Sequence, residues 1–280
     1  MTPEYFNLSF WQVAIATSLI LISCAISLAL QLGLERRLLM ASIRTVVQLL
    51  LVGLILQWVF DLGRLWYVVL SIIALMTLVA GISAVRRTER RYKGVWSDSV
   101  VSMWASSWLV GVVALMAIIQ IPNRGQPWYD PQYSIPLLGM ILGNTLNGIS
   151  LGLDRFGEEL AGKRDQVETL LALGATRWEA ARSSIQTAVR TGMIPTINTM
   201  MVVGIVSLPG MMTGQIIAGM PPNQAVLYQI IIMFLLAAGT SIGTVSVVLL
   251  AYFRLFNSRH QFLPDRLVKK DESGRRKDER

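Results

Sequence analysis

Long apolar blocks alternate with short polar segments along this chain. An apolar helix of about 20 residues crosses a bilayer core of about 30 Å. The pattern predicts seven spans, at residues 10–34, 38–60, 65–85, 100–121, 135–153, 193–208 and 224–253. We therefore expect an all-α, polytopic membrane protein with a transmembrane domain at residues 1–257. The mixed-charge tail at 258–280 has few apolar residues and is predicted to be disordered.

One polar-rich stretch, residues 154–192, lies between two apolar blocks and predicts two short amphipathic helices. The apolar face of the first holds Leu160, Val167, Leu170, Leu171 and Gly174, and that of the second holds Trp178, Ala181, Ile185, Ala188 and Gly192. Gly174 is expected to end the first helix, and Thr176 to cap the second. A helical hairpin of this kind in a membrane protein predicts a docking surface for a soluble partner.

Composition supports the membrane class. Hydrophobic residues make up 53% of the 280 residues and charged residues 15%, whereas soluble domains carry about 25% charged residues. The first residues lack a basic segment and the first apolar block is long, so we expect no cleaved signal peptide. Cys24 is the single cysteine and lies within an apolar block, which favours a small buried or lipid-facing residue.

The basic residues predict the orientation. With the N-terminus outside and the C-terminus inside, only Arg64 and Arg124 fall in outer loops, while nearly all other Lys and Arg residues fall inside. The positive-inside rule therefore favours this topology, in a plasma (bacterial inner) membrane. The net charge of +8 is explained by this distribution, so no nucleic-acid partner is expected.

Residues for catalysis are scarce. His260, in the tail, is the only histidine, and no Asp or Glu lies at the centre of a predicted span. There is no Gly-x-x-x-x-Gly-Lys-Ser/Thr loop, so we expect no ATP site in this chain. An enzyme is therefore disfavoured, and any ATP-driven transport would need ATP and magnesium bound by another subunit.

Arg44 and Gln48 lie one helical turn apart within the second span. A charge at this depth is costly unless it reaches the membrane surface or a partner. One interpretation is an arginine that extends to the inner surface. The other is a residue facing the bundle interior, where it could contact the backbone or an anionic substrate.

The fifth span combines glycines and asparagines. The pairs Gly139/Gly143 and Gly148/Gly152 allow close helix packing, which alone explains the glycines. Asn144 and Asn147 border that face and are harder to explain by packing. We expect these two amides to line a translocation path.

The sixth block contains a helix-breaking pair, Pro209-Gly210. Such a break frees backbone groups and is typical of substrate paths in transporters. Pro209 and Gln215 are therefore candidate path residues. Met211 and Met212 offer thioether ligands for a metal, although Met is also a common filler of apolar cores.

Four motifs stand out in this order: Arg44-Thr45-x-x-Gln48-Leu49, Gly143-Asn144-x-x-Asn147, the segment from Val167 to Thr176, and the segment from Leu208 to Gln215. Together they resemble the Fet-type ABC permease family, which includes bacterial iron-export permeases and plant membrane subunits linked to aluminium tolerance. The similarity extends from about Arg44 to Phe256. The 154–192 stretch also resembles the wider coupling loop of ABC importers, but the later Ile-x-Leu-Pro part of that loop does not align.

The resemblance implies a permease that works with a separate ATPase, most simply as a homodimer. The residues expected to couple to the ATPase are Glu168, Leu170, Leu171, Gly174, Thr176 and Trp178. Export of metal, with iron first, is the leading hypothesis. Alternatives left open are export of a nucleotide sugar or other organic anion that contacts Arg44, and an ATP-independent scaffold or channel.

Overall fold

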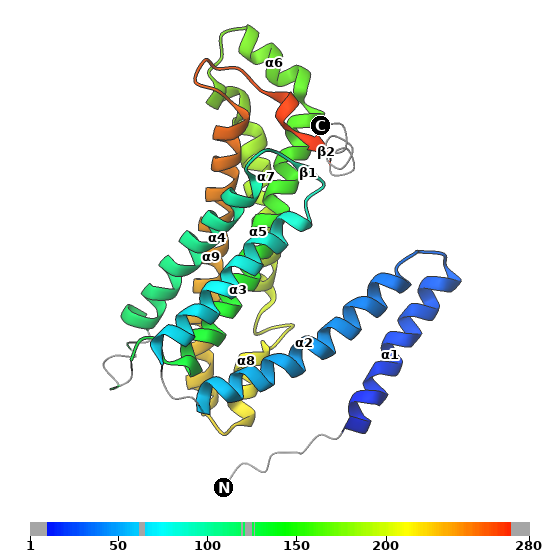
Figure 1. Ribbon diagram of the computed structural model, residues 1–280, viewed down its shortest axis with the longest axis vertical. Coiled ribbons are helices and arrows are strands. Elements are labelled where there is room, and N and C mark those ends of the chain that lie inside the picture. The colour runs from blue at the N-terminus through cyan, green and yellow to red at the C-terminus, as the bar shows by residue number, and fades with distance from the viewer. Residues whose placement is uncertain (1–9, 62–64, 119, 121–124, 126, 270–280) are drawn as a thin grey trace. The chain divides into compact units, whose positions relative to one another are not determined.

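The computed structural model describes residues 10–61, 65–118, 120, 125 and 127–269 (Figure 1). Within them the protein is almost entirely helical, and six helices are long and apolar enough to cross a membrane. The predicted class, an all-α polytopic membrane protein, is confirmed. The chain divides into two compact units, Met1–Leu65 and Trp66–Arg280, and each is described by itself.

Unit 1 is a helical hairpin of α1 (Phe10–Ala29) and α2 (Glu35–Asp61). These helices correspond to the first two predicted spans. The connection is closed by Ser27, whose hydroxyl donates to the Glu35 carboxylate at 3.0 Å and accepts from the Leu34 backbone N–H at 3.0 Å. Most side chains of this unit are apolar and exposed, as expected for helices that face lipid.

Unit 2 is a helical bundle built around α5, which packs against four other long helices. The bundle consists of α3 (Trp66–Arg86), α4 (Val95–Val113) with a π-helical end at Ala114–Ile118, α5 (Pro131–Gly162), α7 (Arg177–Val202) and α9 (Pro222–Leu255). Glycines let α5, α7 and α9 approach closely. A Cβ added at Gly148 would lie 2.5 Å from both Thr240 and Thr244, and one at Gly192 would lie 2.7 Å from the Gly148 carbonyl oxygen.

The predicted count of seven spans is not reproduced by single helices. The sixth block, residues 193–208, is the second half of α7 followed by a break, and the chain then forms the short helix α8 (Gly210–Ile217). The apolar part of α7 after Met193 is only about ten residues long, roughly half a bilayer core. The expected break before Gly210 is present, because Val203 to Pro209 are not helical.

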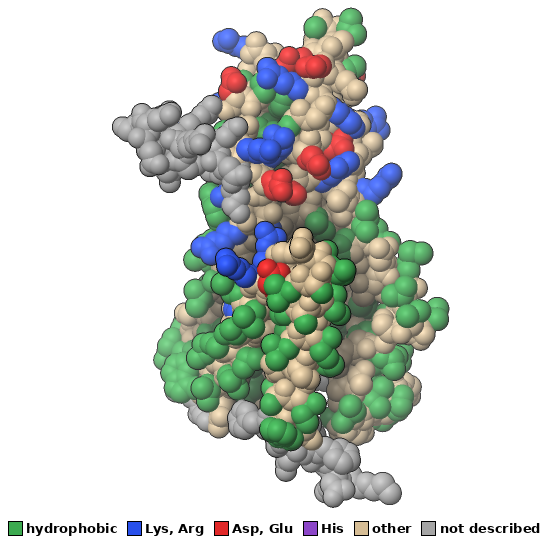
Figure 2. All heavy atoms as spheres, turned by 90° about the vertical axis from the view of Figure 1, so that its right-hand side faces the viewer, with side chains coloured by type: hydrophobic (Ala, Val, Ile, Leu, Met, Phe, Trp, Pro, Cys, Tyr) green, Lys and Arg blue, Asp and Glu red, His purple; other side chains and the backbone are tan. Residues whose placement is uncertain are grey.

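One end of unit 2, which we call the charged end, extends beyond the apolar part of the bundle. It comprises the last turns of α5, α6 (Arg164–Ala172), the start of α7, the strand β1 (Arg90–Arg91) and residues 256–269. Figure 2 shows acidic and basic side chains gathered toward this end, whereas the long helices of unit 2 that lead to it are apolar enough to cross a membrane. The separation matches a protein that enters water at this end.

The prediction of a disordered tail from residue 258 onward was wrong for residues 258–269. They form a 3₁₀ turn (Pro264–Arg266) and the strand β2 (Val268–Lys269), which pairs antiparallel with β1. Phe262 is buried against Phe256 at a ring-centroid distance of 5.1 Å, so an aromatic contact adds to the strand pairing that holds the segment. The rest of the predicted tail, 270–280, lies outside the described residues.

Candidate functional site

The helices of the charged end continue directly from the bundle. Helix α5 was expected to leave the membrane near residue 153, and it runs without interruption to Gly162. At 1.5 Å per residue its 32 residues span about 48 Å, well beyond a bilayer core of about 30 Å. At its end the Glu159 carboxylate is buried and pairs with Arg155 at 2.6 Å and with Lys163. The chain then turns at Lys163 into α6.

The turn between α6 and α7 has the predicted start and stop signals. Gly174 adopts φ +92°, and the Ala175 N–H donates to the Leu170 carbonyl at 3.0 Å, which closes the end of α6. Thr176 caps α7 in a reciprocal arrangement with Glu179, in which each side chain accepts from the other residue's backbone N–H. Hydrogen bonds from the Thr176 backbone and hydroxyl lower the pKa of the Glu179 carboxyl.

The predicted apolar stripe of the hairpin is mostly part of the protein's own core. Its buried members are Leu160, Val167, Ala181, Ile185, Ala188 and Gly192, which pack with other residues of α5 and with α9. These buried side chains are not free to bind a partner, so the predicted docking surface is limited to the residues of the hairpin that stay exposed. Periodicity shows that a face is buried, but it does not show against what.

A smaller set of apolar side chains on α6 and the turn is exposed. Leu173 is 80% exposed, and Leu170 and Trp178 are about half exposed. The rings of Trp178 and of Tyr252 in α9 lie edge to face, with their centroids 5.8 Å apart. Trp178 thus ties the start of α7 to α9, whereas Leu170 and Leu173 are available to another molecule.

Residues 256–262 fold into a tight loop against the start of α7. The Asn257 side-chain oxygen accepts from the backbone N–H groups of Arg259 and Gln261, at 3.0 and 2.9 Å. The imidazole Nδ1 of His260 accepts from the Arg177 backbone N–H at 3.0 Å, one of the N–H groups that the first turn of a helix leaves free. The Arg177 guanidinium donates to the Asn257 carbonyl at 3.2 Å.

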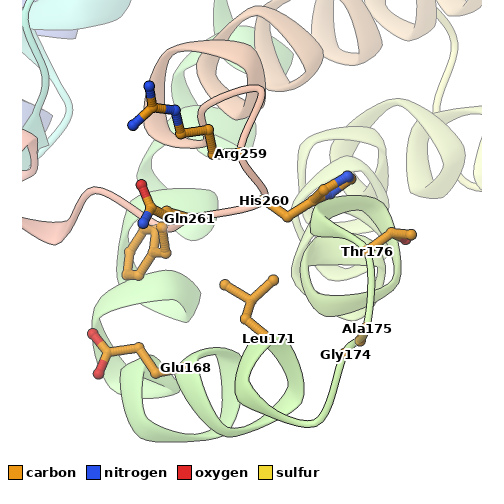
Figure 3. Close-up of a pocket in the computed structure, with 9 residues that line it drawn as sticks. Glu168, Leu171, Gly174, Ala175, Thr176, Arg259, His260 and Gln261 are labelled. Atoms are coloured by element: carbon orange, nitrogen blue, oxygen red, sulfur yellow. The ribbon is translucent and has the colours of Figure 1, made fainter.

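An open pocket of about 590 Å³ lies between the loop and the α6–α7 turn (Figure 3). Its lining residues are Glu168, Leu171, Gly174, Ala175, Thr176, Arg259, His260, Gln261 and Phe262. Leu171 points toward the centre of the pocket, with Glu168 on one side and the loop residues opposite. The pocket therefore combines an apolar floor with a rim of both charges, which suits an inserted protein side chain. Four of the six predicted coupling residues line it.

Sequence reasoning missed the loop side of this pocket, and it also missed an ion pair at the end of α9, the helix that leads into the loop. Arg254, at the end of α9, donates twice to the Asp98 carboxylate, at 2.9 and 3.2 Å, and Asp98 is buried. The Tyr92 hydroxyl donates to the same carboxylate at 3.0 Å; burial and the charge of Asp98 raise the pKa of Tyr92. The one sequence feature that hinted at this ion pair was a glycine, Gly94. A Cβ at that position would lie 2.9 Å from the Arg254 guanidinium.

The two predicted path asparagines have different surroundings. Asn144 is partly buried, and its amide donates to the carbonyl of Met140 in its own helix at 3.0 Å. Asn147 is exposed and accepts from the Arg87 guanidinium at 2.8 Å. Asn147 therefore joins α5 to the segment after α3, near the charged end of the bundle.

The break between α7 and α8 lies beside a second, largely apolar pocket of about 560 Å³. Met212 and Gln229 are among its lining residues, and the Gln229 side-chain oxygen is buried without a hydrogen-bond donor among the described residues. The Gln215 oxygen is also buried without one. Met211 packs against an apolar cluster of α4, α5 and α9, so the two candidate thioether ligands lie in different surroundings.

Arg44 and Gln48 belong to α2 in unit 1, and both are exposed there. Arg44 has no hydrogen bond or ion pair within the described residues. Among those residues no group of three His, Cys, Asp or Glu side chains is close enough to hold a metal ion.

Comparison with known proteins identifies the family. The model of the Uncharacterised protein family (UPF0014) matches residues 10–256. This chain is a UPF0014 protein. Among UPF0014 relatives, the membrane protein slr1647 of Synechocystis sp. is 43% identical over 232 residues, 83% of this chain and 88% of that protein.

The resemblance to Fet-type permeases and plant aluminium-tolerance subunits is confirmed. The probable iron export permease protein FetB of Escherichia coli is 31% identical over 264 residues, 94% of this UPF0014 chain and 98% of FetB. Protein ALUMINUM SENSITIVE 3 of Arabidopsis thaliana is 25% identical over 248 residues, 89% of this chain and 88% of that protein. No solved structure matches.

Proposed function

We propose that this chain is the membrane-spanning permease subunit of an ABC transporter that exports metal, with iron as the first substrate to test. A separate ATPase subunit, which binds ATP and magnesium, would dock on the charged end. The proposal is supported by the similarity to a protein named an iron export permease. It depends most on one observation: an open pocket at the α6–α7 turn, beside the exposed Leu173.

The buried stripe of the hairpin connects this docking site mechanically to the helices of the bundle. Because Leu160, Val167 and Ile185 are packed in the core, α6 cannot move far without moving α5 and α7. Both helices enter the apolar part of the bundle. The path candidate Asn144 lies on α5, and Pro209 lies in the break that follows α7. Closure of the ATPase would therefore tilt the helices that carry the path.

In this proposal the transporter contains two ATPase subunits. They require two docking sites, and one copy of this chain has a single α6–α7 turn. We therefore propose a permease homodimer with a translocation path formed by both copies. Path residues in this proposal are Arg44, Gln48, Asn144, Asn147, Pro209 and Gln215, with Met211 and Met212 as candidate metal ligands.

Co-purification tests the docking site. The tagged chain is isolated from its native membranes in mild detergent, and bound ATPase is quantified. Leu173→Asp should reduce the recovered ATPase at least tenfold, because burial of one leucine side chain contributes about 2 kcal/mol. Gln186→Asp is the matched control, since Gln186 is exposed on α7, about 15 Å along the helix from its cap at Thr176. Equal recovery for both variants, or no ATPase with the unaltered chain, would contradict the proposal.

The substrate needs a separate measurement. Cells that lack this chain should accumulate iron and tolerate less of it, and the gene should restore export. Unchanged iron content and tolerance would remove the metal assignment while leaving the ATPase partnership intact.

A further inference from the structure

The second half of α7 presents a regular apolar stripe to its surroundings. Ile194, Ile197 and Met201 follow one another at steps of three or four residues, and all are exposed. Thr196 is buried on the opposite, bundle-facing side. Steps of three and four are the spacing by which two helices pack along one seam.

Asn198 lies within this stripe, four residues after Ile194 and three before Met201. Its side chain is exposed and has no hydrogen-bond partner among the described residues. It lies about 9 Å past Gly192, which packs against Gly148 next to the Arg87–Asn147 contact. An unpaired amide inside a bilayer is costly, and such side chains are typically hydrogen-bonded across a helix interface.

The break that follows α7 adds backbone groups that also need hydrogen-bond partners. Ile205 and Val206 are 88% and 79% exposed, and the carbonyl oxygens of Gly204, Ile205 and Val206 accept no hydrogen bond from the described residues. The break begins about 16 Å past Gly192, inside the apolar block 193–208 that the sequence predicts as a span, and Figure 1 shows it at the height of α3, a candidate membrane span. Irregular backbone at that depth does not face lipid; it is covered by protein or lines a water-filled cavity.

We propose that a second copy of this chain packs on this surface, with α7 against α7 and the two breaks adjoining across a two-fold axis. In a two-fold contact the same residue meets itself, so the Asn198 amides of the two copies can donate to and accept from each other. A single asparagine in an apolar seam is a known way to fix helix register and oligomeric state. The inference rests on the homodimer in the proposed function and names the surface that forms it.

Cysteine cross-linking tests the contact. Cys24 is replaced by serine, so that any disulfide formed by a single introduced cysteine must join two copies. Met201→Cys, at a position 72% exposed, should give a covalent dimer when native membranes are oxidised, because cysteines near a two-fold axis come within bonding distance. Leu109→Cys, on α4 and 57% exposed, is the matched control and should stay monomeric.

Monomer with both cysteine variants would overturn the proposal. Equal dimer yield from both variants would overturn it as well, since that indicates random collision. Neither outcome changes the expected recovery of the ATPase. The failure of the proposed dimer surface can therefore be distinguished from the failure of the proposed ATPase partnership.

A second measurement addresses Asn198. Asn198→Leu should raise the dissociation constant of the detergent-solubilised dimer about three- to tenfold, in line with interhelical hydrogen bonds in membranes. Thr199→Val is the control, because the Thr199 hydroxyl already donates to the Pro195 carbonyl of its own helix at 2.9 Å. An unchanged dissociation constant for Asn198→Leu would exclude the asparagine contact.

Discussion

The cap between Thr176 and Glu179 is a small, local interaction that holds the first turn of α7 at the docking pocket. Thr176→Ala removes the hydroxyl that accepts from the Glu179 N–H, so the first turn should lose about 1 kcal/mol of local stability. Hydrogen exchange in the detergent-solubilised protein should then show roughly fivefold faster exchange at the start of α7.

Thr187→Ala provides the comparison for this cap. The Thr187 hydroxyl donates to the Ser183 carbonyl within the same helix, an interaction that adds little to helix stability. Exchange at the first turn of α7 should not change in this variant. If the two variants accelerate exchange at the first turn equally, the cap is not what stabilises it.

At the same scale, the structure separates residues that sequence could assign from those that it could not. Gly174 and Thr176 were predicted because a helix stop and a cap are determined by neighbouring residues. The His260–Arg177 and Asp98–Arg254 contacts join positions 83 and 156 residues apart. No local pattern encodes such pairs, so half of the docking pocket was assigned to a disordered tail.

At the scale of elements, periodicity identified buried faces but not their partners. The stripe with Leu160, Val167 and Ile185 was correctly predicted to be apolar and helical, yet it packs inside the bundle. The stripe with Ile194 and Met201 fell within a predicted span and is exposed. A hydrophobic pattern reports that a face avoids water, which is equally true of a core, a lipid contact and a subunit interface.

The glycines of α5 allow a direct test of element packing. A Cβ at Gly148 would overlap Thr240 and Thr244 of α9, whereas one at Gly143 would meet nothing within 4 Å. Gly148→Ala should therefore destabilise the protein by about 1–3 kcal/mol, and Gly143→Ala should be neutral or slightly stabilising. Thermal unfolding of the two variants in the same detergent measures the difference. Similar melting temperatures would show that α5 and α9 do not pack closely at Gly148.

For the whole molecule, the membrane class followed directly from the lengths of the apolar blocks, because the thickness of the bilayer core sets a minimum length for every span. The count of spans was harder to predict, since a helix broken at Val203 to Pro209 has the same composition as a continuous one. The ordered segment 258–269 was also missed, because its few apolar contacts are made with distant elements.

The orientation of the molecule remains a prediction from its basic residues, and labelling can test it. In a Cys24→Ser background, Leu173→Cys lies at the charged end and Asn223→Cys lies at the start of α9, at the opposite end of unit 2. A membrane-impermeant maleimide added to intact cells should label Asn223→Cys and leave Leu173→Cys unmodified until the membrane is opened. This follows because cytoplasmic loops retain Lys and Arg, which are concentrated at the charged end. The reverse labelling pattern would place α6 and its pocket outside the cell, where no ATP-driven subunit could reach them.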